Sequence, residues 1–302
     1  MEITMYSYFT DLLTQKGARE AVHFAKECGF DSVELLELAA PGAKPIFADL
    51  QSARELRRLL DEYGIKCACY SVGVHILADD LGEEGSLSGV EVLKRCADRA
   101  HILGSPYLHH TLMLGRNYAE KTSETLDRQL PYLLDRASQV ARYCAGYGIT
   151  TLYEPQGYYV NGLDGFSRFY EQMKRAGLTV GVCGDVGNCM YVNGDPVEFF
   201  KRYATEMRHV HLKDLRLEDA AFHRQMTAPD RLWDEIIDGR YITDTLLGEG
   251  EVDIDTCMRE LRQAGYRGAY APETTYWNSL GTSLKNNLTR DRNYIFAHYP
   301  DN

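Results

Sequence analysis

The sequence predicts an α/β fold, a single (β/α)8 barrel spanning residues 1–302. Short apolar runs typical of strands alternate with stretches of helical periodicity from end to end. Several helical stretches end in glycine just before a strand, as in GFDSVEL, GIKCACY, GITTLYE, GLTVGV and GYRGAYA. Glycine suits the left-handed cap of a helix that turns into a strand. No G-x-G-x-x-G follows the first strand, which disfavours a doubly wound open sheet.

Predicted strands and helices alternate as repeated units. There are eight strands, which is the number that a closed (β/α)8 barrel requires. The predicted strands are Ile3–Tyr8, Ser32–Leu36, Lys66–Val72, Tyr107–Thr111, Thr150–Tyr153, Thr179–Cys183, His209–Leu212 and Gly268–Ala271. The predicted helices are Ala18–Cys28, Leu50–Tyr63, Gly89–Leu103, Thr125–Tyr147, Phe166–Ala176, Pro196–Thr205, Ile254–Ala264 and Ser283–Ala297.

One stretch interrupts this rhythm. The polar residues 215–251, which include Trp233 and the segment DEIIDGRYITD, separate the seventh strand from the last helix and strand. Loops of this length are uncommon unless they are functional. We therefore expect a long excursion after strand 7 that acts as a lid or a partner-contact element, with a plain surface excursion as the alternative.

Composition and charge limit the function classes. The formal net charge is −11, which disfavours binding to nucleic acid or to an anionic membrane. No apolar run reaches the ~20 residues that span a bilayer, and the N-terminus lacks a secretion signal. The 8 cysteines are then expected to be reduced thiols of a cytoplasmic protein. Cys67 and Cys69 are expected to share one strand face.

Four metal-capable side chains end four consecutive predicted strands: Glu154, Asp185, His211 and Glu273. The carboxyl ends of parallel strands meet at one rim of a barrel, and neighbouring strands lie about 4.8 Å apart. These side chains therefore predict a divalent-metal site. Three carboxylates and one imidazole suit Mn²⁺ or Mg²⁺, with Zn²⁺ or Co²⁺ as competitors through the imidazole. No nucleotide cofactor is expected.

The chain resembles the xylose isomerase-like TIM barrels, the sugar phosphate isomerase/epimerase superfamily. This group includes ketose 3-epimerases, hydroxypyruvate isomerases and inosose dehydratases. The resemblance covers nearly the whole chain and rests on LYEP at strand 5, GDVGN at 184–188, HVHLKD at 209–214, GEGEVD at 248–253 and PET at 272–274. It implies that Glu154, Asp185, His211 and Glu273 bind the metal. In the epimerase branch, the two glutamates also move protons on either face of the substrate.

Two features depart from the epimerase pattern. That branch usually carries a histidine three residues after the aspartate, where this chain has Asn188. Asn188 is expected to contact substrate. Because it replaces that histidine, ketose 3-epimerisation becomes a weaker interpretation of the function. Lys213 and Asp214 match the Lys-Asp pair of other branches, including dehydratase-like members. The resemblance therefore makes Lys213 a candidate catalytic residue.

Further residues are candidates for the pocket. His109 and His110 end the fourth strand, and alternation sends one into the barrel mouth and the other outward. One of them is expected to bind substrate or act as an acid or base. His209 shares the strand face of His211 and is a candidate substrate contact. Other candidate lining residues are Tyr6, Tyr8, Glu34, Tyr70, His75, Tyr158, Tyr159 and Trp277.

These observations predict a metal-dependent isomerase or epimerase of a small sugar or keto-sugar. The metal would stabilise the enediolate formed when an α-proton leaves, and glutamates would take and return the proton. If the substrate carries a β-leaving group, the same enediolate expels it. A lyase therefore stays open as the alternative, either an inosose-type dehydratase or the catalytic subunit of a C-glycoside deglycosidase acting on 3-oxo-glycosides.

The expected assembly is a homo-oligomer, or for the deglycosidase alternative a hetero-oligomer with a small β-rich subunit. Two other function classes are disfavoured. A DNA-repair endonuclease of the same fold would need a richer ligand set for three metals and a basic groove, against a net charge of −11. A non-catalytic binding module would leave the complete ligand set unexplained.

Overall fold

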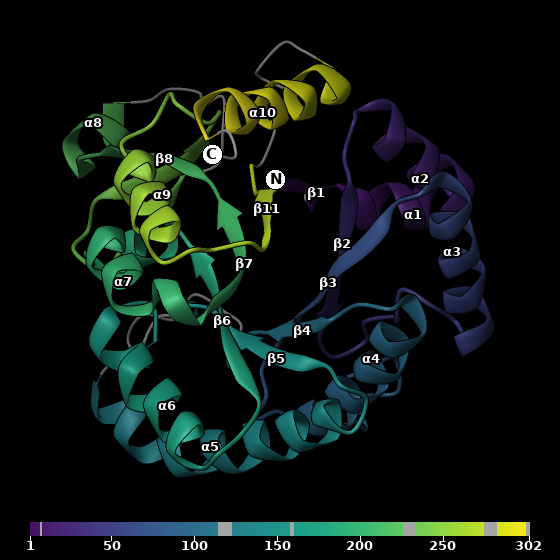
Figure 1. The fold of residues 1–302 in the computed structure, drawn as a ribbon. Helices are drawn as coiled ribbons and strands as arrows, with labels where there is room; N and C mark the ends of the chain where they lie inside the picture. Colours follow the sequence, from purple (N-terminus) through teal and green to yellow (C-terminus); the bar gives the residue numbers. More distant parts are fainter. Residues whose placement is uncertain (7, 114–122, 158–159, 226–232, 275–282, 300–302) are drawn as a thin grey trace.

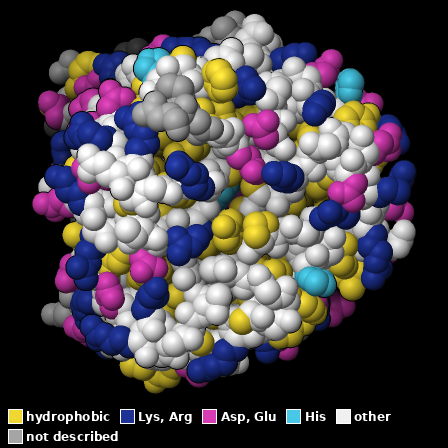
Figure 2. Space-filling view, in the orientation of Figure 1, with side chains coloured by type: hydrophobic (Ala, Val, Ile, Leu, Met, Phe, Trp, Pro, Cys, Tyr) yellow, Lys and Arg dark blue, Asp and Glu magenta, His cyan; other side chains and the backbone are white. Residues whose placement is uncertain are grey.

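The closed barrel predicted from the sequence is confirmed. The computed structural model describes residues 1–302 except 7, 114–122, 158–159, 226–232, 275–282 and 300–302. Eight parallel strands close in the order β1-β11-β7-β6-β5-β4-β3-β2, and helices surround them as an outer ring (Figure 1). No helix among the described residues is long and apolar enough to cross a membrane. Basic and acidic side chains are interspersed on the face shown in Figure 2.

The barrel strands lie close to their predicted positions. They are β1 Glu2–Met5, β2 Ser32–Ala39, β3 Lys66–Val74, β4 Tyr107–His110, β5 Thr150–Tyr153, β6 Val180–Asp185, β7 Met207–Leu212 and β11 Ala269–Pro272. β1 closes the barrel by pairing with β11 on one side and β2 on the other. It is shorter than predicted because Tyr8, with a left-handed φ of 70°, precedes the first helix. Tyr6 therefore lies just past the end of β1.

The helices are α1 Phe9–Lys16, α2 Ala18–Glu27, α3 Leu50–Tyr63, α4 Gly89–Leu103, α5 Ser123–Ala145, α6 Leu163–Arg175, α7 Pro196–Tyr203, α8 Ala220–Gln225, α9 Ile254–Gln263 and α10 Leu284–His298. Local signals explain their ends. Ser88 and Glu91 form a capping box at the start of α4. Gly64 ends α3 with φ of 63°, as the glycine pattern predicted, and Gly104 ends α4 in the same way with φ of 71°. Helices α1 and α8 were not expected.

Inside the barrel, an apolar layer lies beneath a polar one. The apolar layer is formed by Cys69, Leu152 and Cys183. Because side chains of a strand alternate with a period of two, the next inward residues on these strands are Ser71, Glu154 and Asp185. All the cysteines are buried and free, in agreement with the expectation of reduced thiols. The inward residues at the upper, carboxyl end of these strands are therefore polar.

An irregularity in β3 corrects the expectation that Cys67 and Cys69 share one face. Val33 and Glu34 are adjacent in β2, but their pairing partners in β3 are Cys67 and Cys69, which are not adjacent. The register of the two strands therefore shifts at this point. Such a bulge interrupts the alternation of the strand. Cys69 lies in the inner layer, whereas Cys67 lines a surface cavity together with residues of α3.

Two candidate pocket residues lie instead on the outer side of the barrel. Tyr70 donates a hydrogen bond to Glu37, which also binds Arg99 of α4 at 2.9 Å. His110 packs edge-on against Tyr153, with ring centroids 5.0 Å apart. The expectation that Tyr70 lines the pocket is therefore wrong, because the inward residues next to it on β3 are Cys69 and Ser71. Of the histidine pair, His110 is the outward member.

Within the excursion, described residues outside 226–232 form a small antiparallel sheet beside the barrel. Its strands are β8 Asp214–Glu218, β10 Tyr241–Thr245 and β9 Asp234–Glu235, in that order. The excursion is fastened to the turn of 3₁₀ helix at Asn188–Val192, which follows β6. The Ile237 N–H donates to Tyr191 O at 3.2 Å, and Arg240 binds Asn193 Oδ1 at 2.8 Å. A lid or partner-contact role for the excursion stays a prediction.

Asp214 anchors the end of this excursion. Its buried carboxylate accepts the N–H groups of Gly248 at 2.9 Å, Gly250 at 2.8 Å and Val252 at 3.2 Å. The N–H of Leu215 adds a fourth bond at 3.0 Å. A side chain at Gly250 would overlap the Asp214 carboxylate, so the glycine allows this close approach. Backbone N–H groups of the GEGEVD motif therefore bind the carboxylate of Asp214.

Replacing Asp214 with alanine should destabilise the protein. The substitution leaves four N–H groups without their acceptor, and each buried unpaired group costs about 1–3 kcal/mol, so we expect a loss of at least about 3 kcal/mol. Urea unfolding measures this change. The matched control is Asp219→Ala, which removes an exposed helix cap from Phe222 and should cost about 1 kcal/mol or less. Equal losses in the two variants would contradict the anchoring role of Asp214.

His110 should make stability depend on pH. Burial lowers the pKa of His110 from its ordinary value to about 4. The unfolded chain, with a histidine pKa near 6.5, therefore binds the proton more readily. Stability should be highest above about pH 6.5 and fall by about 3 kcal/mol as the pH drops to about 4. In urea unfolding between these pH values, His110→Asn should remove this part of the slope, while His101→Asn on the exposed face of α4 should retain it.

Candidate metal centre

The four expected metal ligands end four neighbouring barrel strands. Glu154 follows β5, Asp185 ends β6, His211 lies in β7 and Glu273 follows β11. These strands are adjacent in the order β11-β7-β6-β5. The Glu273 N–H donates to Leu212 O at 2.8 Å, so β11 stays in register with β7 as far as this residue. The parallel register therefore brings the four side chains to one point of the rim.

One donor atom of each residue faces a shared centre. His211 Nδ1 lies 3.4 Å from Glu154 Oε2 and 3.2 Å from Glu273 Oε2. Ligand atoms of Glu154, Asp185 and His211 all lie within 4.8 Å of one another. Four buried atoms here make no hydrogen bond: Glu154 Oε2, Asp185 Oδ2, His211 Nδ1 and Glu273 Oε2. Because buried polar atoms are normally paired, this set fits a divalent cation that would accept a lone pair from each.

Asp185 is oriented by the turn that follows it. Its Oδ1 accepts the N–H groups of Gly187 at 2.8 Å and Asn188 at 2.7 Å, which leaves Oδ2 for the shared centre. A Cβ on residue 187 would lie 2.6 Å from Lys213 Cγ. The glycine of the GDVGN motif therefore makes room for the lysine.

Lys213 supplies positive charge beside the carboxylates. Its Nζ lies 3.0 Å from Asp185 Oδ2 and 3.1 Å from Glu273 Oε2, and it donates to Asn188 Oδ1 at 3.2 Å. Burial alone would lower the pKa of Lys213, but Asp185 and Glu273 outweigh burial and raise it well above its ordinary value. The lysine is therefore an ammonium ion at neutral pH.

The carboxylates differ in their tendency to ionise. Burial raises the pKa of Asp185 to about 6, against the opposing effect of Lys213. Burial also disfavours ionisation of Glu154, but His109 and His211 outweigh it and hold its pKa well below the usual range. Burial also disfavours ionisation of Glu273, but Lys213 outweighs burial and lowers the pKa of this carboxyl group. Both glutamates are therefore ionised at neutral pH and can serve as ligands or proton acceptors.

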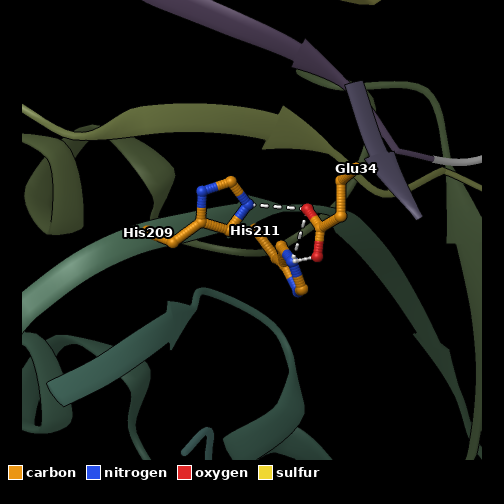
Figure 3. A group of neighbouring side chains, drawn as sticks. All are labelled: Glu34, His209 and His211. Atoms are coloured by element: carbon orange, nitrogen blue, oxygen red, sulfur yellow. Dashed lines mark hydrogen bonds and ion pairs between the residues drawn. The ribbon is translucent and has the colours of Figure 1, made fainter. Parts of the chain in front are cut away.

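A buried carboxylate, Glu34 of β2, lies behind His211 (Figure 3). Its oxygens lie 3.1 and 3.3 Å from His211 Nε2, and Oε2 lies 2.6 Å from His209 Nε2. Ser71 donates a further hydrogen bond to Glu34. Burial would raise the pKa of Glu34, but the two histidines outweigh it and hold the pKa well below its ordinary value. Glu34 is thus a fully enclosed, hydrogen-bonded anion rather than part of the pocket wall.

The structure brings several other candidates to the site. His109 is the inward member of its pair, with Nε2 3.4 Å from Glu154 Oε1. Tyr6 stacks on His211 with ring centroids 4.6 Å apart and planes 13° apart. Asn188 is held by Lys213, as described above. Ser71 was not among the residues predicted from the sequence. It lies two residues after Cys69 on the inward face of β3, so strand alternation would have placed it in the barrel interior.

The remaining candidates do not join this cluster. His209 is wholly buried behind Glu34, so a direct substrate contact is corrected to a contact with that carboxylate. His75 lies past the end of β3, where its Nδ1 accepts the N–H of Leu77 at 3.3 Å. Among the described residues, His75 belongs to none of the clusters of side chains that could hold a metal ion. Trp277, Tyr158 and Tyr159 lie outside the described residues.

The chain is similar to a curated enzyme over most of its length. It is 28% identical to inosose dehydratase of Geobacillus kaustophilus over 227 residues, which are 72% of this chain and 70% of that protein. The identity extends beyond the strand-end motifs, because it covers the greater part of both chains.

Solved structures share the fold. The D-allulose 3-epimerase of a Methylomonas species, in complex with D-allulose, superposes with a TM-score of 0.70 at 18% identity and covers 99% of this chain and 97% of its own. A xylose isomerase-like TIM barrel protein of Mycobacterium smegmatis, in complex with magnesium, superposes with a TM-score of 0.69 at 16% identity, over 99% and 96% of the two chains. At these identities the likeness shows the fold alone.

The family comparison agrees with the barrel and with the strand-end motifs. The model of the family described as xylose isomerase-like TIM barrel matches residues 22–291, which include all four strand-end ligands. The chain belongs to the xylose isomerase-like TIM barrel family.

Proposed function

We propose that the protein is a divalent-metal-dependent isomerase or epimerase of a small sugar or keto-sugar. The observation that carries this proposal is the set of four buried donor atoms, one on each neighbouring strand end, that face one centre without hydrogen bonds. A binding module would not need three carboxylates held close together, because their mutual repulsion is costly. Proton transfer next to a carbonyl group uses this combination of ligands and bases.

The metal would be held by Glu154 Oε2, Asp185 Oδ2, His211 Nδ1 and Glu273 Oε2. When bound, it would polarise a substrate carbonyl or hydroxyl oxygen and stabilise the negative charge left when an α-proton departs. Three oxygen ligands and one nitrogen suit Mn²⁺, and Mg²⁺ is supported by the magnesium complex of the mycobacterial structure. The residues therefore fit the metal expected from the sequence.

The two glutamates are the proposed acid and base. Both are ionised, and they flank His211 at 3.4 and 3.2 Å. The Glu273 side chain is 26% exposed, whereas that of Glu154 is 4% exposed. Substrate entering from solvent would therefore meet Glu273 first and would place its α-carbon between the two carboxylates. One glutamate takes the proton, and the other returns it to the opposite face or to the neighbouring carbon.

Dehydration is the second candidate, and Lys213 favours it. The inosose dehydratase relative is a lyase by name, and it aligns over 72% of this chain. Lys213 places an ammonium ion at the edge of the site, 3.1 Å from Glu273 Oε2. This group could protonate a β-hydroxyl as it leaves, while a glutamate removes the α-proton. The C–H and C–O bonds would break, and the products would be an unsaturated ketone and water.

Proton exchange tests the shared step of both candidates. We expect purified protein to contain a divalent metal and to exchange the proton α to a carbonyl in D₂O on a panel of keto-sugars and keto-inositols. The exchange should stop on chelation and return when Mn²⁺ is added. NMR measures the exchange, and mass spectrometry distinguishes loss of water from isomerisation. A protein without metal that exchanges no proton on this panel would contradict the proposal.

Replacing either proposed base should suppress the exchange. Glu154→Gln and Glu273→Gln are each expected to lower its rate by about 10²–10⁴-fold, since each substitution removes a proton acceptor and a metal ligand. The control is Glu198→Gln, an exposed residue of α7, which should exchange at the rate of the unchanged protein. Unchanged rates in the first two variants would show that these carboxylates do not carry the chemistry.

A further inference from the structure

We propose that Glu34 is a positioning residue of the metal centre, which holds His211 so that Nδ1 faces the metal. This inference rests on the proposed function and adds a residue that acts through a ligand. The hydrogen bonds of Glu34 to His211 and His209 cross the barrel interior between β2 and β7 (Figure 3). These strands are not neighbours, because β1 and β11 lie between them.

The first argument concerns the burial of Glu34. Its side chain is wholly buried, and a buried carboxylate is unfavourable unless polar partners surround it. Its partners are His209, His211 and Ser71, and none of these is a lysine or arginine. A salt bridge to a permanent cation therefore does not explain the residue. Hydrogen bonds to the two histidines and the serine do explain the buried carboxylate, and one of these histidines, His211, is a proposed metal ligand.

The second argument concerns the two ring nitrogens of His211. Nε2 faces the Glu34 carboxylate, so in the metal-bound state this nitrogen carries the hydrogen and donates it. Nδ1 then presents a lone pair toward Glu154 and Glu273. A carboxylate that fixes the tautomer and orientation of a ligating histidine strengthens metal binding. Tyr6, stacked on the ring, limits its rotation.

The third argument is that Glu34 also reaches a second ligand. Ser71 donates to Glu34, so its oxygen can accept a hydrogen bond from His109 Nδ1, 2.9 Å away. The other nitrogen of His109 lies 3.4 Å from Glu154 Oε1. One buried carboxylate thus contacts His211 directly and is linked through Ser71 to His109, whose ring lies beside Glu154.

Strand irregularities place both ends of this contact. The register of β2 against β3 shifts immediately before Glu34, and that of β6 against β7 shifts immediately before His209. Bulges of this kind re-aim side chains and occur next to active sites. As a result, His209 pairs with the inward residue Cys183, and His211 pairs with Asp185. The inward direction of both histidines therefore depends on the bulge.

Glu34, His209 and His211 could instead bind an ion themselves, because their ligand atoms lie within 4.8 Å. The pairing argues against this. The histidine nitrogens that face Glu34 lie 2.6 and 3.1 Å from its oxygens, which are hydrogen-bond distances. The nitrogens left without a hydrogen bond are the opposite ones, Nδ1 of each ring. The free atom of His211 therefore points to the four-ligand centre.

The test compares Glu34→Gln with Glu37→Gln in the full chain. Glu37 is the matched control because it is a buried glutamate of the same strand on the outer side of the barrel, paired with Arg99. Isothermal titration with Mn²⁺ should show binding about 10–100-fold weaker in Glu34→Gln and unchanged in Glu37→Gln. NMR of ¹⁵N-histidine-labelled, Zn²⁺-loaded protein should show the Nε2–H resonance of His211 in the unchanged chain and its loss or shift in Glu34→Gln.

A second variant keeps the test valid if Glu34→Gln does not fold. Ser71→Ala removes only one donor from Glu34, and it should weaken Mn²⁺ binding by a smaller factor and shift the ring resonances of His109. Unchanged affinity and an unchanged His211 resonance in Glu34→Gln would overturn this inference alone. If only Ser71→Ala folds, unchanged affinity and unchanged His109 resonances in that variant would overturn it. Loss of one of two metal equivalents in Glu34→Gln would also overturn it, since Glu34 would then be a ligand. Failure of the unchanged protein to bind Mn²⁺, Mg²⁺ or Zn²⁺ would overturn the proposed function as well.

Discussion

The repulsion among three clustered carboxylates, two of them buried, is the constraint on which the site depends. Glu154, Asp185 and Glu273 meet at one point of the barrel rim, where water does not screen their charges fully. The chain offsets this repulsion with Lys213, His211 and His109, all within 3.4 Å of a carboxylate oxygen. A divalent cation would complete the compensation. The same charges that make the site costly to form therefore favour the proposed binding of a cation.

This compensation organises the structure around the rim. Lys213 faces the carboxylates, and its side chain fits only because residue 187 is glycine. The next residue, Asp214, faces the other way and binds the backbone of residues 248–252. The excursion that begins there is also fastened to the turn that follows Asp185. The proposed ligands, the lysine and the excursion are thus joined by a continuous set of contacts.

The proposed chemistry uses the unequal exposure of the two glutamates. The more exposed Glu273 lies on the side from which substrate would enter, while Glu154 is supported from behind by His109. Metal and carboxylates define proton transfer, whereas the fate of the substrate depends on the groups at the rim. Lys213 and Asn188 are such groups, and they distinguish this site from the epimerase pattern. Barrels of this fold carry different functions through the groups at the carboxyl-end rim of the strands.

The sequence by itself determined the barrel and the positions of the four strand-end side chains and Lys213, because each follows from a short strand and the turn directly after it. Only the tertiary structure chose between His109 and His110 and turned Tyr70 outward, because the phase of alternation depends on neighbouring strands and on a bulge beside Cys67. It also revealed the contact of Glu34 with His209, 175 residues apart. No local pattern encodes such a pairing, since it exists only once the barrel has closed.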